Sequence, residues 1–208
     1  AIASQRLFNA TKILRIGAEQ LFRVTTDWAV WDDTYAFMSG KDPEYPARNL
    51  VEGTFSTLEL DLVAFWDAHQ EPALERFVTP SHEIKEQLPG GFRLFLNNLQ
   101  LAGRVGPTNG LAGYASLDGT VWVLAAMPIL TSLGEGPPRG TLFMGRRLDE
   151  ERLQILREQI DSSFQIETAH GRWPMGRSVV QTISPSALRA QIAIEDVTKQ
   201  GRLVLILT

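Results

Sequence analysis

The residues best suited to chemistry are two adjacent acids, Asp32 and Asp33, and two adjacent bases, Arg146 and Arg147. Paired carboxylates act as general acid and general base when they flank one scissile bond. Adjacent residues on a helix point about 100° apart, however, so Asp32 and Asp33 cannot easily flank a single bond. We expect one of the two carboxylates to face inward, where burial requires a hydrogen-bond donor.

There are two interpretations of what such an inward aspartate binds. It caps or hydrogen-bonds the neighbouring loop, or it receives a cationic or hydrogen-bonding group of a ligand. Arg146 and Arg147 leave a predicted strand on opposite faces, so one should meet solvent and the other the helix-covered side of the sheet. The inward arginine needs a carboxylate, either from Asp32 or Asp33 or from a ligand.

An aromatic stripe runs along the helix that carries the two acids. Trp28, Trp31 and Tyr35 recur at helical spacing and are either core residues or the wall of a pocket between helix and sheet. Such a wall would suit an amino acid, an amine or a small aromatic molecule. Trp122 lies in the most apolar predicted strand and would form core or pocket floor. The candidate ligand-binding residues are therefore Trp28, Trp31, Asp32, Tyr35, Trp122 and Arg146.

No sequence motif for catalysis or metal binding accompanies these residues. His69, His82 and His170 are scattered, and none has a second ligand at metal spacing. The chain has no cysteine, which excludes disulfides, iron–sulfur clusters and Cys-ligated zinc. Neither Gly-x-Ser-x-Gly nor a phosphate loop occurs. We predict no catalytic residue, metal or cofactor, and a hydrolase is a remote alternative.

Composition describes an ordinary globule. Of the 208 residues, 44% are apolar and 21% are charged, and the net charge is −4. That charge gives no electrostatic reason to expect nucleic acid as a partner. The longest apolar run, from Val121 to Leu130, is too short to span a bilayer and contains Pro128. The N-terminus also lacks the pattern of a signal peptide.

A long helix over residues 4–37 must position the acids and the aromatic stripe. An apolar heptad repeat predicts it, because every seventh residue is large and a second series follows by three. The stripe packs either on the protein's own sheet or, in its first half, on a second copy of the chain. The two series are Leu7, Leu14, Leu21 and Trp28, and Ala10, Gly17, Val24 and Trp31.

The remaining pattern predicts an α+β fold, with strands around a helical crossover. We expect strands over 58–66 and 73–78, two short helices within 81–99, three strands, a helix from 149 to about 162, and further short strands. This order is typical of PAS-like sensor folds, and a long leading helix is typical of their extracytoplasmic, Cache-like variety. We expect a single domain over 1–208, with the PAS-like core at 55–162. Residues 163–208 could form an appended subdomain leading to the membrane. The three strands after the crossover are at 111–117, 120–130 and 141–148, and the last strands are at 164–168, 178–183, 188–195 and 203–207.

Two segments carry a resemblance to a known family. One is Trp-Asp-Asp-Thr-Tyr-Ala-Phe at 31–37, and the other is Pro-Ile-Leu-Thr-Ser at 128–132, followed by Gly-Glu-Gly-Pro-Pro-Arg-Gly at 134–140 and a strand. In this order they resemble the CHASE domains of the fourth type, which are extracytoplasmic sensor modules of bacterial and archaeal receptors. The resemblance covers roughly residues 27–149, with a weaker echo at 183–207.

The resemblance implies an extracytoplasmic (periplasmic) sensor domain of a membrane receptor, which performs no catalysis itself. It implies flanking transmembrane helices and a separate cytoplasmic output domain, such as a histidine kinase or a cyclic-di-GMP enzyme. An unknown small molecule bound between helix and sheet, and a homodimer through the N-terminal helix, are the expected partners. The alternative is a module that binds no ligand and acts through dimerisation or a partner protein.

Overall fold

The chain forms two compact units in the computed structural model, which describes residues 2–101, 105–117, 120–160, 164–170, 188–192 and 201–207. The first unit combines Ala1–Glu19, Gly113–Val123 and Arg147–Thr208. The second unit combines Gln20–Ala112 and Leu124–Arg146.

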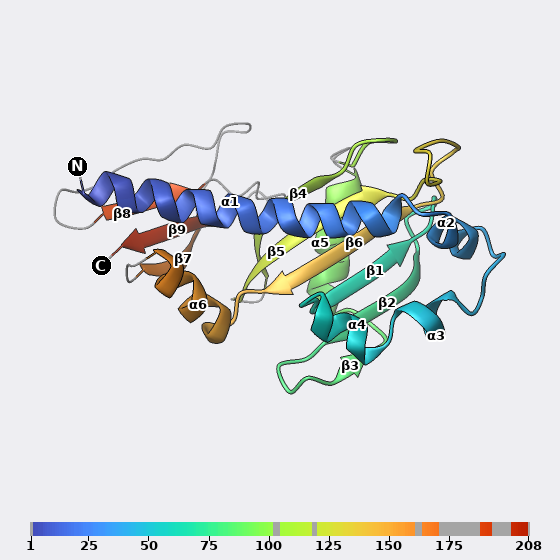
Figure 1. Ribbon diagram of the computed structural model, residues 1–208, viewed down its shortest axis with the longest axis horizontal. Helices are drawn as coiled ribbons and strands as arrows, with labels where there is room; N and C mark the ends of the chain where they lie inside the picture. The colour runs from blue at the N-terminus through green and yellow to red at the C-terminus, as the bar shows by residue number, and fades with distance from the viewer. Residues whose placement is uncertain are drawn as a thin grey trace. The chain divides into compact units, whose positions relative to one another are not determined.

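The main sheet has six strands in the order β3-β2-β1-β6-β5-β4 (Figure 1). Strand β1 pairs antiparallel with both β2 and β6, and all five of its residues are buried. Burial of the whole strand is expected where helices cover both faces of a sheet. The strands are β1 (Leu62–Trp66), β2 (Pro72–Val78), β3 (Ile84–Lys85), β4 (Leu111–Leu117), β5 (Thr120–Pro128) and β6 (Thr141–Arg147).

The long helix α1 spans Ile2–Ala29, and its residues 12–29 bury one stripe of side chains. Its buried side chains recur every three or four residues, as on the core-facing side of an amphipathic helix. The hydroxyl of Thr25, the one polar member of the stripe, donates to the carbonyl oxygen of Leu21 at 2.8 Å and so needs no outside partner. From Leu14 onward, this stripe therefore packs within its own chain. It consists of Leu14, Ala18, Leu21, Thr25 and Ala29.

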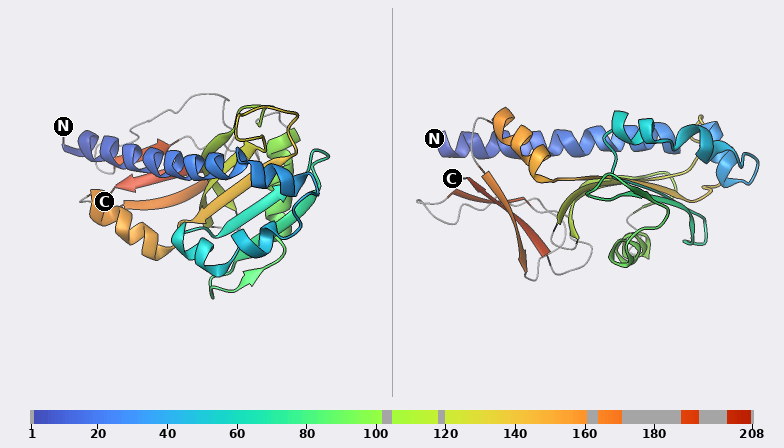
Figure 2. Two further views of the ribbon diagram at one scale, coloured as in Figure 1. Left: turned by 45° about the vertical axis from the view of Figure 1, so that its right-hand side comes forward. Right: turned by 90° about the horizontal axis from the view of Figure 1, so that it is seen from below.

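In the second unit, helices lie on both faces of the sheet (Figure 2). One face carries the second half of α1 with three short helices, and the other carries α5 (Gly90–Leu101). Side chains of β1 alternate between these faces. Phe65 contacts rings of the short helices, while Ala64 pairs with Glu75 of β2, whose carboxylate binds α5. The short helices are α2 (Asp32–Met38), α3 (Tyr45–Asn49) and α4 (Glu52–Thr57).

In the first unit, α6 (Glu150–Ile160) precedes a second, three-stranded antiparallel sheet. Asp149 caps this helix, because its Oδ1 accepts from the backbone N–H of Arg152 at 3.0 Å. The strand order is β7-β9-β8. These strands are β7 (Phe164–His170), β8 (Leu188–Ile192) and β9 (Gly201–Leu207). The predicted strand at 178–183 lies outside the described residues.

The predicted helix over 4–37 is wrong in its last part. Helix α1 ends at Ala29, Val30 forms a parallel bridge with Leu130, and Trp31 is extended with φ −143° before α2 begins. The sequence has no Pro or Gly at this point. The break arises instead from a tertiary contact, because the N–H of Leu130 donates to the carbonyl oxygen of Ala29 at 3.1 Å.

The predicted strand over 58–66 begins only at Leu62. The residues just before it follow the end of α4 at Thr57, and Glu59 adopts the left-handed conformation with φ 54°. The N–H of Leu60 then donates to the carbonyl oxygen of Phe55 at 2.9 Å, the six-to-one bond that closes a helix. The alternating leucines at 58 and 60 therefore belong to a helix end.

The two helices predicted within 81–99 are also corrected. Ile84 and Lys85 pair with Val78 and Phe77 as the short strand β3, so the first predicted helix is a hairpin. The second is a single helix, α5, that begins at Gly90. The other predicted strands and the helix after Asp149 are confirmed within the described residues.

Candidate functional site

The two segments that resemble a sensor family bind each other in the second unit. The backbone N–H of Asp32 donates to Oγ of Ser132 at 3.0 Å, and the backbone N–H of Ser132 donates to Oδ1 of Asp32 at 2.9 Å. Of the two interpretations of Asp32, the loop contact is the one the structure contains. Both Asp32 and Asp33 are exposed, so the expectation that one faces inward is wrong. The break at Trp31 turns both carboxylates outward at the start of α2.

Tyr35 holds the far end of the same loop, the β5–β6 connection at 129–140. Its hydroxyl donates to the carbonyl oxygen of Pro137 at 3.2 Å and accepts from Nε of Arg139 at 3.2 Å. The guanidinium of Arg139 also lies over the Tyr35 ring, 5.4 Å from its centroid. Gly136 makes room for this contact, because a Cβ there would lie 3.0 Å from the Tyr35 hydroxyl. The two segments that carry the family resemblance therefore hold α2 and this loop together.

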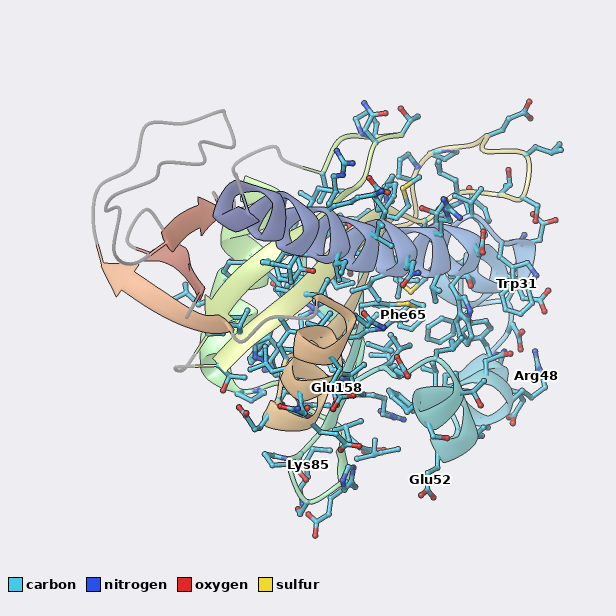
Figure 3. The ribbon with its side chains drawn as sticks, turned by 60° about the vertical axis from the view of Figure 1, so that its left-hand side comes forward. Trp31, Arg48, Glu52, Phe65, Lys85 and Glu158 are labelled. Carbon is cyan, nitrogen blue, oxygen red and sulfur yellow. The ribbon has the colours of Figure 1, made fainter. Side chains whose placement is uncertain are left out.

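Trp28 and Trp31 belong to an aromatic cluster that joins the end of α1 to the sheet. The rings of Trp28 and Trp31 meet edge to face at 6.2 Å, and Trp31 packs on Tyr45 at 5.9 Å. Tyr45 continues to Phe65 of β1 at 6.0 Å, and Trp31 and Phe65 lie at the α2 side of the sheet in Figure 3. Both tryptophans are half-buried. The cluster comprises Trp28, Trp31, Phe37, Tyr45 and Phe65.

Tyr45 is the centre of this cluster and is fully buried. Its hydroxyl shares a hydrogen bond of 2.8 Å with Thr34 of α2, which is also fully buried. Burial raises the pKa of Tyr45 to about 12, although the bond to Thr34 opposes the shift. A buried, bonded tyrosine of this kind fixes α2 and α3 to each other.

The other predicted residues do not join this group. Trp122 lies in the first unit, where the guanidinium of Arg147 sits 5.0 Å from its ring centroid. Arg147 is only 9% exposed and is therefore the inward arginine. Arg146 is half-buried in the second unit, and its Nη2 donates to the carbonyl oxygen of Leu58 at 3.0 Å. Asp32, one expected partner of the inward arginine, is held by Ser132.

Sequence reasoning missed a buried ion pair of the second unit, between Glu75 and Arg93. The Glu75 side chain is 2% exposed, and its oxygens accept from Nε and Nη2 of Arg93 at 3.0 and 2.6 Å. The backbone N–H of Leu88 also donates to Oε2 at 3.0 Å. This group ties β2 to α5 and to the loop before it. A single acid among apolar residues at an inward strand position was its only local signal.

The hydrogen bonds and ring contacts described above hold segments of the chain to one another. Within the residues that the structure describes, no three or more histidines, aspartates and glutamates come together in a way that could hold a metal ion.

Comparison with known proteins identifies the family. The CHASE4 domain matches residues 14–167. The chain belongs to the CHASE4 domain family. A curated relative, the methanogenesis regulatory histidine kinase FilI of Methanothrix harundinacea (strain 6Ac), is 29% identical over 158 residues. That match covers 75% of this chain and 18% of the kinase, so the chain spans less than a fifth of the curated relative's length.

Solved structures share the fold of this CHASE4 domain. The extracellular domain of vpHK1S-Z8, assigned as a histidine kinase, has a TM-score of 0.62 and 13% identity, covering 99% of this chain and 92% of that one. The periplasmic domain of LuxQ from Vibrio cholerae has a TM-score of 0.52 and 14% identity, covering 99% and 100%. The predicted PAS/Cache-like α+β fold, with its long N-terminal helix on an antiparallel sheet, is confirmed.

The CHASE4 domain is therefore a sensor domain of the kind found in signalling receptors, and the two solved domains of the same fold are extracellular and periplasmic. Among the described helices, none is both long and apolar enough to cross a membrane.

Proposed function

We propose that this CHASE4 domain is the extracytoplasmic signal-input domain of a membrane-bound histidine kinase. In this proposal a small ligand binds the domain and shifts α1 between two arrangements, which flanking membrane segments pass to the output domain. The relation to a regulatory histidine kinase supports the choice of output. The similarity to extracellular and periplasmic domains supports the location.

The observation that supports transmission of the signal through α1 is the attachment of this helix to the sheet. The end of α1 is bonded to the chain just after β5 through Ala29 and Leu130, and it packs on β1 through the aromatic cluster. A change in the sheet of the second unit therefore has a direct route into the helix. Rigid elements with two discrete arrangements are what such coupling needs.

The test is a thermal-shift screen of amino acids, organic acids, amines and neutral metabolites, with mass spectrometry of whatever the denatured protein releases. A ligand that binds only the folded domain raises its stability by about 2.7 kcal/mol at a hundredfold excess over Kd. We expect one compound class to raise Tm saturably. If no compound co-purifies and none raises Tm, ligand sensing is refuted.

A second candidate function is a ligand-free dimerisation or protein-interaction module. The contacts of Trp31 and Tyr35 favour it, because both residues are engaged within their own chain. The homodimer through α1 is part of both proposals. Since Leu14 and Leu21 are buried within the chain, pairing must use the helix before them. Sedimentation of wild type and Leu7→Glu tests this: loss of dimer in the variant alone supports it.

A further inference from the structure

The indole nitrogen of Trp66 is a buried donor without a described acceptor. Trp66 is the last residue of β1 and is only 3% exposed. No hydrogen-bond acceptor for its Nε1 exists among the residues that the structure describes. A buried donor left unpaired costs about 1–3 kcal/mol, so folded proteins seldom retain one without a reason.

The register of β1 places this indole on the α5 side of the sheet. Phe65 contacts Phe37 on the other side, and successive residues of a strand face opposite ways. Trp66 instead packs edge to face on Phe143 of β6, with ring centroids 5.6 Å apart. Glu75, which binds α5, lies on this same side as the partner of Ala64.

The nearest residues on β1 and β6 are apolar apart from one hydroxyl. Thr141 lies directly opposite Trp66 in the β1–β6 register, and directly opposite side chains share one face of the sheet. Thr141 is 8% exposed, and Ala64 and Phe143 beside the pair are fully or almost fully buried. An apolar surface with a few convergent polar groups is the usual composition of a small-molecule site.

The buried carboxylate on this side of the sheet is already paired. Glu75 is the buried acid here, and its oxygens are occupied by Arg93 and the N–H of Leu88. An ionised ligand group would therefore meet the neutral indole and hydroxyl and lose its hydration without a counter-charge. A neutral oxygen acceptor would gain the Trp66 N–H at no such cost.

We propose that Trp66 and Thr141 mark a small-molecule site on the α5 side of the sheet, for a neutral ligand with a compact apolar body and one oxygen acceptor, such as a ketone, ester or alcohol. The inference rests on the proposed sensory function and specifies where the ligand binds and its chemical class. It places the ligand on the opposite face from Trp31 and the rest of the aromatic cluster.

The experiment follows the indole N–H resonances of the five tryptophans by two-dimensional ¹⁵N–¹H NMR. The Trp66 resonance is assigned by its loss in Trp66→Phe or, if that variant does not fold, by elimination with Trp→Phe at the other four positions. The neutral probes are 2-pentanone, cyclopentanone, ethyl acetate and 2-butanol. Cyclopentane and cyclopentanecarboxylate are the apolar and charged counterparts of cyclopentanone.

We expect at least one neutral probe to shift the Trp66 resonance saturably and to raise Tm. Cyclopentane should leave that resonance in place, and the carboxylate should bind at least tenfold more weakly than cyclopentanone. Thr141→Val should weaken probe binding severalfold, while the control Trp28→Phe, on the other face, should not. The site is refuted if no neutral probe moves the Trp66 resonance. It is also refuted if the Trp66 N–H proves to donate only to a bound water or to a protein acceptor. A ligand from the thermal-shift screen that still binds Trp66→Phe and Thr141→Val would refute the site but leave the sensory function standing.

Discussion

Removing Arg93 tests how much its ion pair with the buried Glu75 contributes to the free energy of unfolding. Arg93→Met deletes the bonds from Nε and Nη2 and leaves the carboxylate with only the N–H of Leu88. Removing one partner of a fully buried ion pair costs about 3–5 kcal/mol. The Arg93 side chain is 41% exposed, however, so water can reach the position it vacates. We therefore expect a loss of about 2 kcal/mol in the free energy of unfolding, which is below the fully buried figure.

Equilibrium urea unfolding, followed by tryptophan fluorescence, measures this loss. The double variant Glu75→Leu/Arg93→Met removes both charges and should come within about 1 kcal/mol of the wild type, because apolar side chains can replace a buried pair. Arg48→Met is the matched control. Arg48 makes two bonds to Asp42, but its side chain is 52% exposed, so its loss should destabilise the protein less than the loss of Arg93.

Two outcomes would contradict the reasoning about Glu75. Arg93→Met might cost no more than Arg48→Met, which would mean that water alone satisfies the carboxylate. Alternatively, the double variant might be less stable than Arg93→Met, which would mean that Glu75 contributes through Leu88 rather than through the ion pair. Either result would remove the argument that the buried carboxylate on this side of the sheet is already paired.

Three further predictions concern single side chains. The pKa of Tyr45 is raised from 10.0 to about 12. The stability contributed by its neutral hydroxyl is therefore complete below pH 10 and is lost as pH rises through 12. Between pH 10 and 12 in urea titrations, the wild type should therefore lose roughly 2 kcal/mol more of its free energy of unfolding than Tyr45→Phe does. Gly140→Ala should destabilise by at least about 3 kcal/mol in the same assay, since φ is +132° and a Cβ would lie 1.9 Å from a carbonyl oxygen. Its control, Gly53→Ala in a helix with open space around it, should instead stabilise by up to about 1 kcal/mol, and equal effects would contradict the prediction. Gly17→Ala should leave Tm nearly unchanged in the wild type, because the added Cβ would lie 3.3 Å from the Tyr114 hydroxyl. In a Tyr114→Phe background the same substitution should raise Tm. An equal effect in both backgrounds would show that the contact does not matter.

Much of the fold could be predicted from sequence because its signals are local. Alternation and turn residues located β2, β4, β5 and β6, and the heptad pattern located α1. What failed depended on tertiary contacts. No breaker residue marks the end of α1, because the bridge from Val30 to Leu130 ends it. The leucines at 58 and 60 imitate a strand, although Glu59 closes a helix there.

The contacts of the candidate site residues could be predicted only in part, for the same reason. The sequence pointed to Asp32 and offered a loop contact as one of two partners, and the loop contact is present. It grouped Trp122 and Arg146 with the aromatic stripe, although strand patterns carry no information on which residues converge across a sheet. The bond between Glu75 and Arg93 joins residues 18 positions apart, beyond the reach of any helix or strand period.

The junction between α1 and the loop after β5 has a mechanical consequence. Val30 pairs with Leu130 in parallel, and Asp32 and Ser132 exchange two more hydrogen bonds next to it. A pull along α1 would load these bonds together in shear, since they lie side by side across two segments running the same way. Bonds loaded in shear share the force, whereas bonds opened one at a time do not. The helix end should therefore behave as a stiff joint, and tension on α1 should reach β5 and β6 before the joint opens.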